Sequence, residues 1–205
     1  MKILLFGASG MIGSRIAAEA RGRGHEVTGV TRQGTDGTRT ADAADAGTVA
    51  TLAVGHDAVV LAVRQPQVEP LLAVGRATLD GMREAGVRRL AVVGGAGSLE
   101  VAPGVRVIDR LTLEDIPEEY RYQVPAQVAL LELIQANADD LEWTYLSPPV
   151  EIEPGDRTGT YRVGANQLLS DEAGHSRISA EDYAAALIDE LETGRSIRRH
   201  ITVAY

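Results

Sequence analysis

Residues 2–32 read KILLFGASGMIGSRIAAEARGRGHEVTGVTR and carry the clearest secondary-structure signals of the chain. Residues 2–6 are a continuous apolar run, which is typical of a parallel β-strand covered on both faces. Apolar residues then recur at helical spacing over 11–23, and two glycines end the pattern. Residues 26–31 are rich in β-branched side chains and predict a second strand. The chain is therefore expected to begin with a strand–helix–strand unit.

The alternation of strands and helices continues along the chain, after a polar loop over 32–45 with a short strand near Thr40. The expected strands are 57–63, 88–93, 141–147 and 200–205, and the expected helices are 46–55, 68–86, 124–139 and 179–192. Asp45 and Ser179 are placed to begin helices, and Gly86 is placed to end one. This order predicts an α/β fold with a doubly wound parallel sheet.

Two regions depart from the alternation. Residues 98–117 lack periodicity and are interpreted as a long functional loop with a short helix. Residues 151–179 are expected to form a small C-terminal cap within a single domain spanning 1–205. Short strands are expected there at 157–164, 166–170 and 176–179, with a hairpin turn at 171–174.

The composition narrows the classes of function. The 205 residues include 29 acidic and 20 basic side chains, and the formal charge of −9 argues against nucleic acid or anionic lipid as a partner. The chain has no cysteine, which excludes disulfides and thiolate catalysis. Its histidines are scattered without metal-ligand spacing, at His25, His56, His175 and His200. No apolar run is long enough for a membrane helix, and the N-terminal run is too short for a signal peptide. We expect a cytoplasmic protein without a metal site.

The glycines between the first strand and the first helix have a physical use. Gly7 permits a tight turn, Gly10 lets the backbone approach a pyrophosphate, and Gly13 lets the helix pack close to the strand. The helix N-terminus presents N–H groups and a partial positive charge to phosphates. The spacing is G-x-x-G-x-x-G and differs from the G-x-G-x-x-G of the commoner dinucleotide-binding fingerprint. The alternative interpretation is therefore a glycine-rich turn with a purely structural role. The candidate nucleotide-binding residues are Gly7, Ser9, Gly10, Met11, Ile12 and Gly13.

The end of the second strand indicates which dinucleotide is bound. NAD-binding proteins place a carboxylate there for the ribose hydroxyl groups, but this chain has Thr31 and Arg32. A guanidinium favours a 2′-phosphate, so the sequence favours NADP(H), with NAD(H) as the alternative cofactor. Arg32 is otherwise a solvated surface residue. Asp42 either lies under the adenine or is an ordinary loop carboxylate.

Seven segments appear in an order that resembles a known family. The chain is similar to the NAD(P)H-flavin reductases, which are atypical short-chain dehydrogenase/reductase proteins close to the NmrA-like and biliverdin-reductase-B groups. The similarity covers nearly the whole chain, and GGAGSLEV and WTYLSP are its more specific parts. The segments are GASGMIG, GHEVTGVTR, GHDAVV, GGAGSLEV, LEWTYLSPP, RTGTYRVGANQLLSDEAGHSRIS and EDYAAALIDELE.

The resemblance implies a Rossmann-type fold, bound NADP and reduction of a conjugated acceptor such as a flavin. It places Ala62, Val63 and Arg64 near the cofactor ribose. It places the turn of Gly94, Gly95 and Ala96 beside the nicotinamide ribose, with Ser98 just beyond, and Pro148 over the nicotinamide. The alternative reading of each is loop chemistry at a strand end, although strand C-termini are where open α/β sheets bind ligands.

One departure from ordinary short-chain dehydrogenases concerns their Tyr-x-x-x-Lys pair. Tyr120 is followed four residues later by Val124 and Tyr122 by Ala126, and the segment EEYRYQVPAQVALLEL contains no lysine. Counting back from the tryptophan of the next strand puts Gln127 or Val128 at the lysine position. A ketone needs a positioned acid, whereas a flavin or quinone spreads the incoming electron pair over its rings. Ser98, Tyr120 and Tyr122 stay candidate catalytic groups, or else structural or substrate-contact residues.

The sequence leaves two functions open, and it disfavours a third, an isomerase or epimerase, because such enzymes normally retain the Tyr–Lys pair. The first is an enzyme that transfers hydride from NADPH to a flavin or a quinone-like acceptor, mainly by holding the two rings together. The second is a redox sensor of NmrA type that binds NADP(H) without turnover. Flavin is in either case a candidate ligand, and the partner is a small conjugated molecule. The chain is expected to be a monomer or a homodimer.

Overall fold

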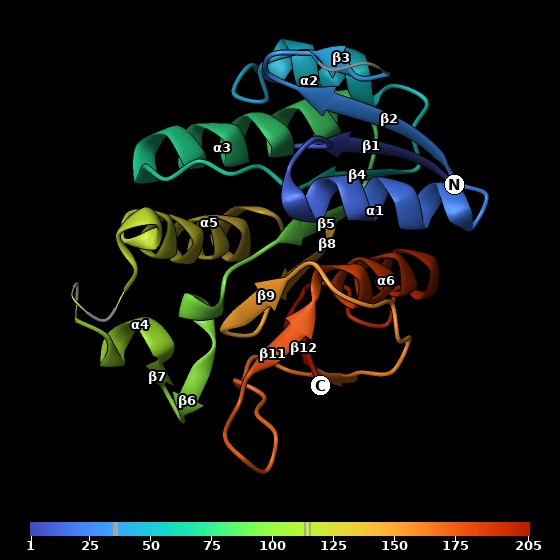
Figure 1. Cartoon of the computed structure of the whole chain (residues 1–205). Helices are drawn as coiled ribbons and strands as arrows, with labels where there is room; N and C mark the ends of the chain where they lie inside the picture. The colour runs from blue at the N-terminus through green and yellow to red at the C-terminus, as the bar shows by residue number, and fades with distance from the viewer. Residues whose placement is uncertain (35–36, 113, 115) are drawn as a thin grey trace.

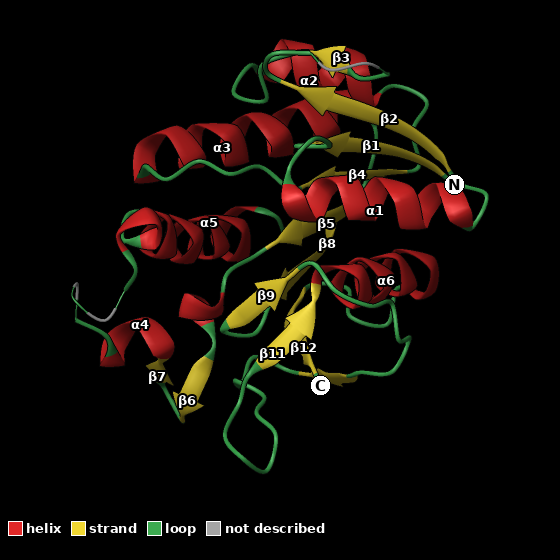
Figure 2. Ribbon diagram, viewed as in Figure 1, coloured by secondary structure: helices red, strands yellow, loops and turns green. Residues whose placement is uncertain are grey.

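The computed structural model describes residues 1–34, 37–112, 114 and 116–205, and its centre is an eight-stranded sheet (Figures 1 and 2). The strand order is β10-β12-β8-β5-β4-β1-β2-β3. Its strands are β1 (Lys2–Phe6), β2 (Glu26–Thr31), β3 (Arg39–Thr40), β4 (Ala58–Leu61), β5 (Arg89–Val93), β8 (Glu142–Ser147), β10 (Arg162–Gly164) and β12 (Arg199–Ala204). Every pairing is parallel except that of β10 with β12. The predicted doubly wound Rossmann-type sheet is confirmed.

The point where the strand order reverses lies at β1. From β1 the chain moves outward through β2 to β3, and it then returns to pair β4 with the other side of β1. In open α/β sheets such a reversal leaves a crevice at the carboxyl ends of the strands, where ligands bind. The glycine loop over 7–10 and the loop after β4 both leave the sheet at this edge.

Helices cover both faces of the sheet. Helices α1 (Met11–Gly22) and α6 (Ala180–Thr193) pack on one face, and α2 (Ala46–Ala53), α3 (Val68–Ala85) and α5 (Gln123–Asn137) pack on the other (Figure 1). Alternate residues of each strand enter opposite core layers, because successive side chains of a strand point to opposite faces. In β1, Ile3 and Leu5 join the layer under α1 and α6, whereas Leu4 and Phe6 join the other.

Local signals for the helix ends are confirmed. The Asp45 carboxylate accepts the Gly47 N–H at 3.1 Å, and the Ser179 hydroxyl accepts the Asp182 N–H at 3.0 Å. Gly86 ends α3 in the left-handed conformation with φ +72°. Each of these devices satisfies helix-end groups that have no partner inside the helix.

The two irregular regions contain more pairing than expected. Within 98–117 the chain forms an antiparallel hairpin of β6 (Glu100–Ala102) and β7 (Val105–Arg106), followed by α4 (Val107–Arg110). Reading this whole stretch as a loop with one helix was wrong, because the hairpin was missed. Residues 113 and 115 of the stretch, and 35 and 36 of the loop after β2, lie outside the described residues.

The expected strand over 166–170 and its hairpin with 176–179 are also wrong. The chain does turn at Asp171–Gly174, but the flanking segments pair elsewhere. Strand β11 (Arg177–Ser179) pairs in parallel with β9 (Glu151–Glu153), and β10 joins the central sheet. The main chain of Glu100 bonds to Asn166 and Leu168, so the segment 151–179 is also joined to the β6–β7 hairpin.

Candidate functional site

Two glycines of the loop after β1 are required by the fold itself. Gly7 has φ +84°, and a Cβ atom there would lie 2.2 Å from the carbonyl oxygen of Ala62. A Cβ atom on Gly13 would lie 2.1 Å from the carbonyl oxygen of Gly7. Both distances are far inside van der Waals contact, so any side chain would force backbone apart. The predicted roles of Gly7 in the turn and of Gly13 in helix packing agree with this geometry.

Gly10 is different, because the protein leaves room for a side chain there. Its φ is −69°, and a Cβ atom would meet only the carbonyl oxygen of Gly7, at 3.4 Å. Gly10 begins α1 without a capping side chain, and the first helical turn contains no acidic residue. The N–H groups of Met11, Ile12 and Gly13 have no partner inside the helix, because they belong to its first turn. The loop thus forms a bare cradle that suits an anion.

A cavity of about 470 Å³ opens beside this cradle, and we call it the glycine-loop cavity. It lies at the carboxyl ends of β1, β2 and β4, where the strand order reverses. Nine of the predicted cofactor-binding residues line it, namely Gly7, Ser9, Gly10, Thr31, Arg32, Asp42, Ala62, Val63 and Arg64. Its wall also includes residues that sequence reasoning missed, among them Ala43, Gln65 and Pro70. They carry no chemical motif, so no local signal marks them.

Seven predicted residues are not part of that cavity wall. Met11, Ile12 and Gly13 lie in the first turn of α1, where their backbone N–H groups are the relevant feature. The others lie beyond β5 and β8, further along the same sheet edge, namely Gly94, Gly95, Ala96 and Pro148. The predicted set is therefore divided between two parts of one edge.

Three charged side chains line the glycine-loop cavity. Arg32 stands directly after β2, and Asp42 accepts the Ala44 N–H at 3.0 Å in a local turn. The Arg64 Nε donates to Gln123 Oε1 at 3.0 Å, and its guanidinium carbon lies 5.5 Å from the centre of the Tyr120 ring. Arg64 therefore joins the cavity to the start of α5. Tyr120 is 44% exposed and Tyr122 is 71% exposed.

The third catalytic candidate, Ser98, is buried in the turn after β5. It is only 4% exposed, and its hydroxyl donates to the Gly95 carbonyl oxygen at 2.9 Å. The Ser98 Oγ also lies 3.1 Å from the Ser147 Oγ and 3.3 Å from the Nε2 of His200. Burial lowers the pKa of His200 to about 4. Sequence reasoning treated His200 as one of four scattered histidines, because 102 residues separate it from Ser98.

The sequence put Gln127 or Val128 at the position of the missing lysine, and both residues lie buried in α5. Gln127 is buried in α5, and the buried Tyr145 hydroxyl donates to its main-chain oxygen at 2.7 Å and lies 2.9 Å from its Oε1. Burial raises the pKa of Tyr145. Lys2 is the only lysine of the chain, and it lies at the start of β1, at the opposite edge of the sheet. No lysine side chain is therefore available to assist a tyrosine at the carboxyl ends of the strands.

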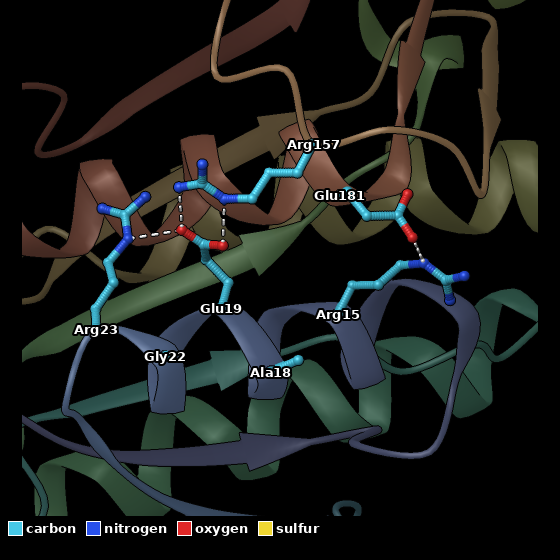
Figure 3. A pocket seen from close by; sticks show the side chains of 7 residues that line it. All are labelled: Arg15, Ala18, Glu19, Gly22, Arg23, Arg157 and Glu181. Carbon is cyan, nitrogen blue, oxygen red and sulfur yellow. Dashed lines mark hydrogen bonds and ion pairs between the residues drawn. The ribbon is translucent and has the colours of Figure 1, made fainter.

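A second cavity, of about 500 Å³, lies between the flank of α1 and the loop over 154–160, and we call it the clamp cavity (Figure 3). Charged side chains line it, but they are bound to one another. Glu19 receives two hydrogen bonds from Arg157, both at 2.7 Å, and one from Arg23 at 2.7 Å. Arg15 pairs with Glu181 at 2.6 Å. The hydrogen bonds from Arg157, followed by those from Arg23, outweigh burial and lower the pKa of Glu19 to about 2.

The glycine-loop cavity suits a dinucleotide better than the clamp cavity does. The glycine-loop cavity has an uncapped helix end, an open position at Gly10 and arginines in its wall. These features suit phosphates. Among the described residues, no group of three or more His, Cys, Asp or Glu side chains could hold a metal ion. No helix in the described part of the chain is long and apolar enough to cross a membrane.

Comparison with known proteins agrees with a nucleotide-binding role for the glycine loop. Residues 7–193 match the family model described as NAD(P)H-binding. The chain belongs to this family. One relative, the "Uncharacterized protein YwnB" of Bacillus subtilis, is 38% identical over 212 residues, which cover 99% of this chain and 98% of that protein. The resemblance found in the sequence is thereby confirmed at the level of the family.

Three solved structures are similar over the full length of this NAD(P)H-binding chain, covering all of it. A "Putative exported protein" from Burkholderia pseudomallei is 46% identical, with a TM-score of 0.90 and 100% of its own chain covered. A "putative epimerase" from Bacteroides thetaiotaomicron is 37% identical, with a TM-score of 0.90 and 96% covered. A "putative NADH-flavin reductase" from Streptococcus pneumoniae is 32% identical, with a TM-score of 0.83 and 99% covered. The name of the first relative means that the cytoplasmic location stays a prediction.

Proposed function

We propose that this protein is an NADPH-dependent reductase of a flat conjugated acceptor, a flavin or a quinone. The observation that supports the proposal is the pairing of an uncapped glycine-loop cradle with a helix α5 that contains no lysine. Such a site can hold a nicotinamide, but it has no lysine to support the protonation of a ketone oxygen. The S. pneumoniae relative carries a flavin-reductase name, which agrees with this class of acceptor.

The residues of the chain divide the work of binding. The N–H groups at the start of α1 would hold the pyrophosphate, and Arg32 would pair with a 2′-phosphate. Arg64, Ala62 and Val63 would line the ribose, and the turn after β5 would support the nicotinamide end. When bound, the reduced nicotinamide supplies a hydride. The protein then contributes proximity and orientation, and solvent supplies the proton that follows the hydride.

Turnover with different acceptors tests the reaction. The purified protein is mixed with NADPH and FMN, menadione or cyclohexanone, and loss of the reduced nicotinamide absorbance is followed. We expect faster oxidation with FMN or menadione than with the ketone. A ketone that reacts faster than both contradicts the proposal, because it needs the acid that the site lacks.

The same missing lysine also suits a second function, a redox sensor that binds NADP(H) without reacting. The discriminating result is a tight complex with NADP(H) together with no turnover across flavins and quinones. Either outcome requires the same cradle, so binding alone does not separate the two functions.

The cofactor preference has a separate test in Arg32→Glu. We expect this variant to weaken NADPH binding at least about tenfold, or roughly 1.4 kcal/mol, and to weaken NADH binding much less. Arg39→Glu is the matched control, because Arg39 is also exposed near the end of β2 but does not line the cavity. Equal losses for both cofactors would mean that Arg32 does not contact the 2′-phosphate.

A further inference from the structure

A chain of hydrogen-bonding groups runs beneath the turn that follows β5. It starts at His200 of β12, passes Ser147 at the end of β8 and Ser98 of the 3-10 turn η1 (Ala96–Ser98), and ends at the carbonyl oxygen of Gly95. The distances are 2.9 Å from His200 Nε2 to Ser147 Oγ, 3.1 Å between the two serine oxygens, and 2.9 Å from Ser98 Oγ to the Gly95 oxygen. Three segments distant in sequence therefore meet at one turn.

The direction of the chain follows from its last member. A carbonyl oxygen only accepts, so the single hydrogen of the Ser98 hydroxyl points to Gly95. Ser98 can then only accept from Ser147 or from His200. With the Nε2 of His200 protonated, each group donates to the next and every hydrogen is used. The burial that keeps His200 neutral agrees with a role in which it orients neighbours without carrying charge.

The turn itself lies directly on this chain of groups. The Gly94 N–H donates to the Leu146 carbonyl oxygen at 2.8 Å. A Cβ atom at Gly94 would lie 2.2 Å from a ring carbon of Tyr145 and 2.8 Å from the Ser147 Oγ. His200 packs edge-on against the same tyrosine ring, with 5.5 Å between the ring centres. The position of the Gly94–Ser98 backbone is thus set by the strand that carries Ser147.

We propose that His200 and Ser147 are positioning residues that hold the Gly94–Ser98 turn in the shape that receives the nicotinamide end of the cofactor. The inference rests on the proposed function, because that function places the nicotinamide at this turn. In this proposal Ser98 is a positioning residue and does not donate a proton to the substrate. Its hydrogen is committed to Gly95, so Ser98 transmits the orientation set by His200 to the backbone.

The two halves of the cofactor allow the proposal to be tested. Adenosine 2′,5′-bisphosphate carries only the groups that the glycine-loop cavity would bind, whereas NADPH also has the nicotinamide half. Both ligands are titrated calorimetrically into the wild type, His200→Leu and His200→Gln. Leucine removes the hydrogen bond, and glutamine can restore it. We expect His200→Leu to bind NADPH about five- to tenfold more weakly, His200→Gln to recover most of the loss, and the bisphosphate to bind all three proteins equally.

Controls separate this role from a general loss of structure. His56→Leu is the matched variant, because His56 is also half-buried and lies 2.9 Å from the hydroxyl of Thr28, but it precedes β4 at the opposite sheet edge. It should leave both affinities unchanged. Ser147→Ala removes one oxygen atom and should reproduce the effect of His200→Leu, which keeps the test valid if the leucine variant fails to fold.

The outcomes are distinct. Wild-type affinity for NADPH in both His200→Leu and Ser147→Ala would overturn the proposal, as would an equal loss for NADPH and the bisphosphate. Failure of glutamine to recover binding would also overturn it, because the role requires only hydrogen bonding. If the wild type binds neither ligand, the proposed function itself is wrong, which is a different result.

Discussion

The two cavities that lie against α1 differ in how they satisfy charge. In the clamp cavity, five charged side chains line the wall and the carboxylates bind the arginines directly. In the glycine-loop cavity, small residues make up most of the wall beside three charged side chains, and the end of the helix has no capping side chain. Helix α1 therefore has paired charges along its flank and an uncapped N-terminus at its end.

The contrast distinguishes a cavity whose charged groups bind one another from a cavity with an uncapped helix end. Ion pairs already neutralise the clamp cavity, so a further ligand would have to displace Arg157 from Glu19. The ion pair of Arg157 with Glu19 joins the loop over 154–160 to α1. In the glycine-loop cavity, the helix end has no capping side chain and no acidic residue in its first turn, so its N–H groups are suited to an anion.

Alanine substitutions at Gly7 and Gly10 should differ most in their effect on the free energy of unfolding. Gly7→Ala should lower the free energy of unfolding by about 3 kcal/mol, because it combines an unfavourable left-handed conformation with a backbone clash. Urea unfolding measures this loss. Gly10→Ala is the control, because its Cβ fits, and its free energy of unfolding should stay within about 0.5 kcal/mol of the wild type. Equal stabilities of the two variants would contradict the assignment of Gly7 to the fold.

Next in size is the clamp. Glu19 is 12% exposed, and Glu19→Gln should lower the free energy of unfolding at pH 7 by about 2 kcal/mol, because Arg157 and Arg23 lose their shared partner. The pKa of Glu19 falls from 4.5 to about 2 on folding, so this stabilisation is complete above pH 4.5 and is lost as the pH falls toward 2.

Urea unfolding at a series of pH values checks the clamp prediction. The gap between wild type and Glu19→Gln should narrow below pH 4.5. Binding of NADPH near neutral pH should be the same in both proteins. A loss of NADPH affinity in this variant would break the distinction between the two cavities.

The third effect concerns binding alone. Gly10→Ala should weaken NADPH by about tenfold, or roughly 1.4 kcal/mol, because the added methyl group occupies the approach of the pyrophosphate. Calorimetric titration measures the affinity, and the melting temperature serves as the control for folding. Unchanged affinity would mean that the ligand does not approach this glycine.

The smallest effect is expected for the outer pair of the clamp. Arg15 and Glu181 are each about a quarter exposed, so Arg15→Gln should cost about 0.5 kcal/mol at low salt and almost nothing in 1 M NaCl. Unfolding in urea at the two salt concentrations checks the difference. A loss that persists at high salt would indicate a contribution from packing and not from charge.

Much of the fold could be predicted from the sequence because its signals are local. The Asp45 and Ser179 caps, the end of α3 at Gly86 and the turn at Gly7 each depend on a few neighbouring residues. The buried strands are also readable, since they are short apolar runs between turn residues. The family resemblance added the residues after β4, three of which line the cavity with the glycines.

The irregular regions were predicted poorly because their partners are remote. Strand β10 pairs with β12, which lies almost forty residues further on, and Glu100 bonds to the main chain of Asn166 and Leu168. A three-residue strand has too few side chains to show a period. Its conformation is decided by the edge that it meets, not by its own residues.

The sequence alone is enough to predict the glycine turn, the alternation of strands and helices outside the two irregular regions, and the absence of a Tyr–Lys pair. Each of these depends on residue identity or on spacing within one element, and needs no knowledge of the folded chain. The folded structure was needed to learn which histidine lies against Ser98, which glycine leaves room for a side chain, and which charges of the clamp cavity are paired. Those facts depend on distances between segments that are remote in sequence, and packing sets such distances.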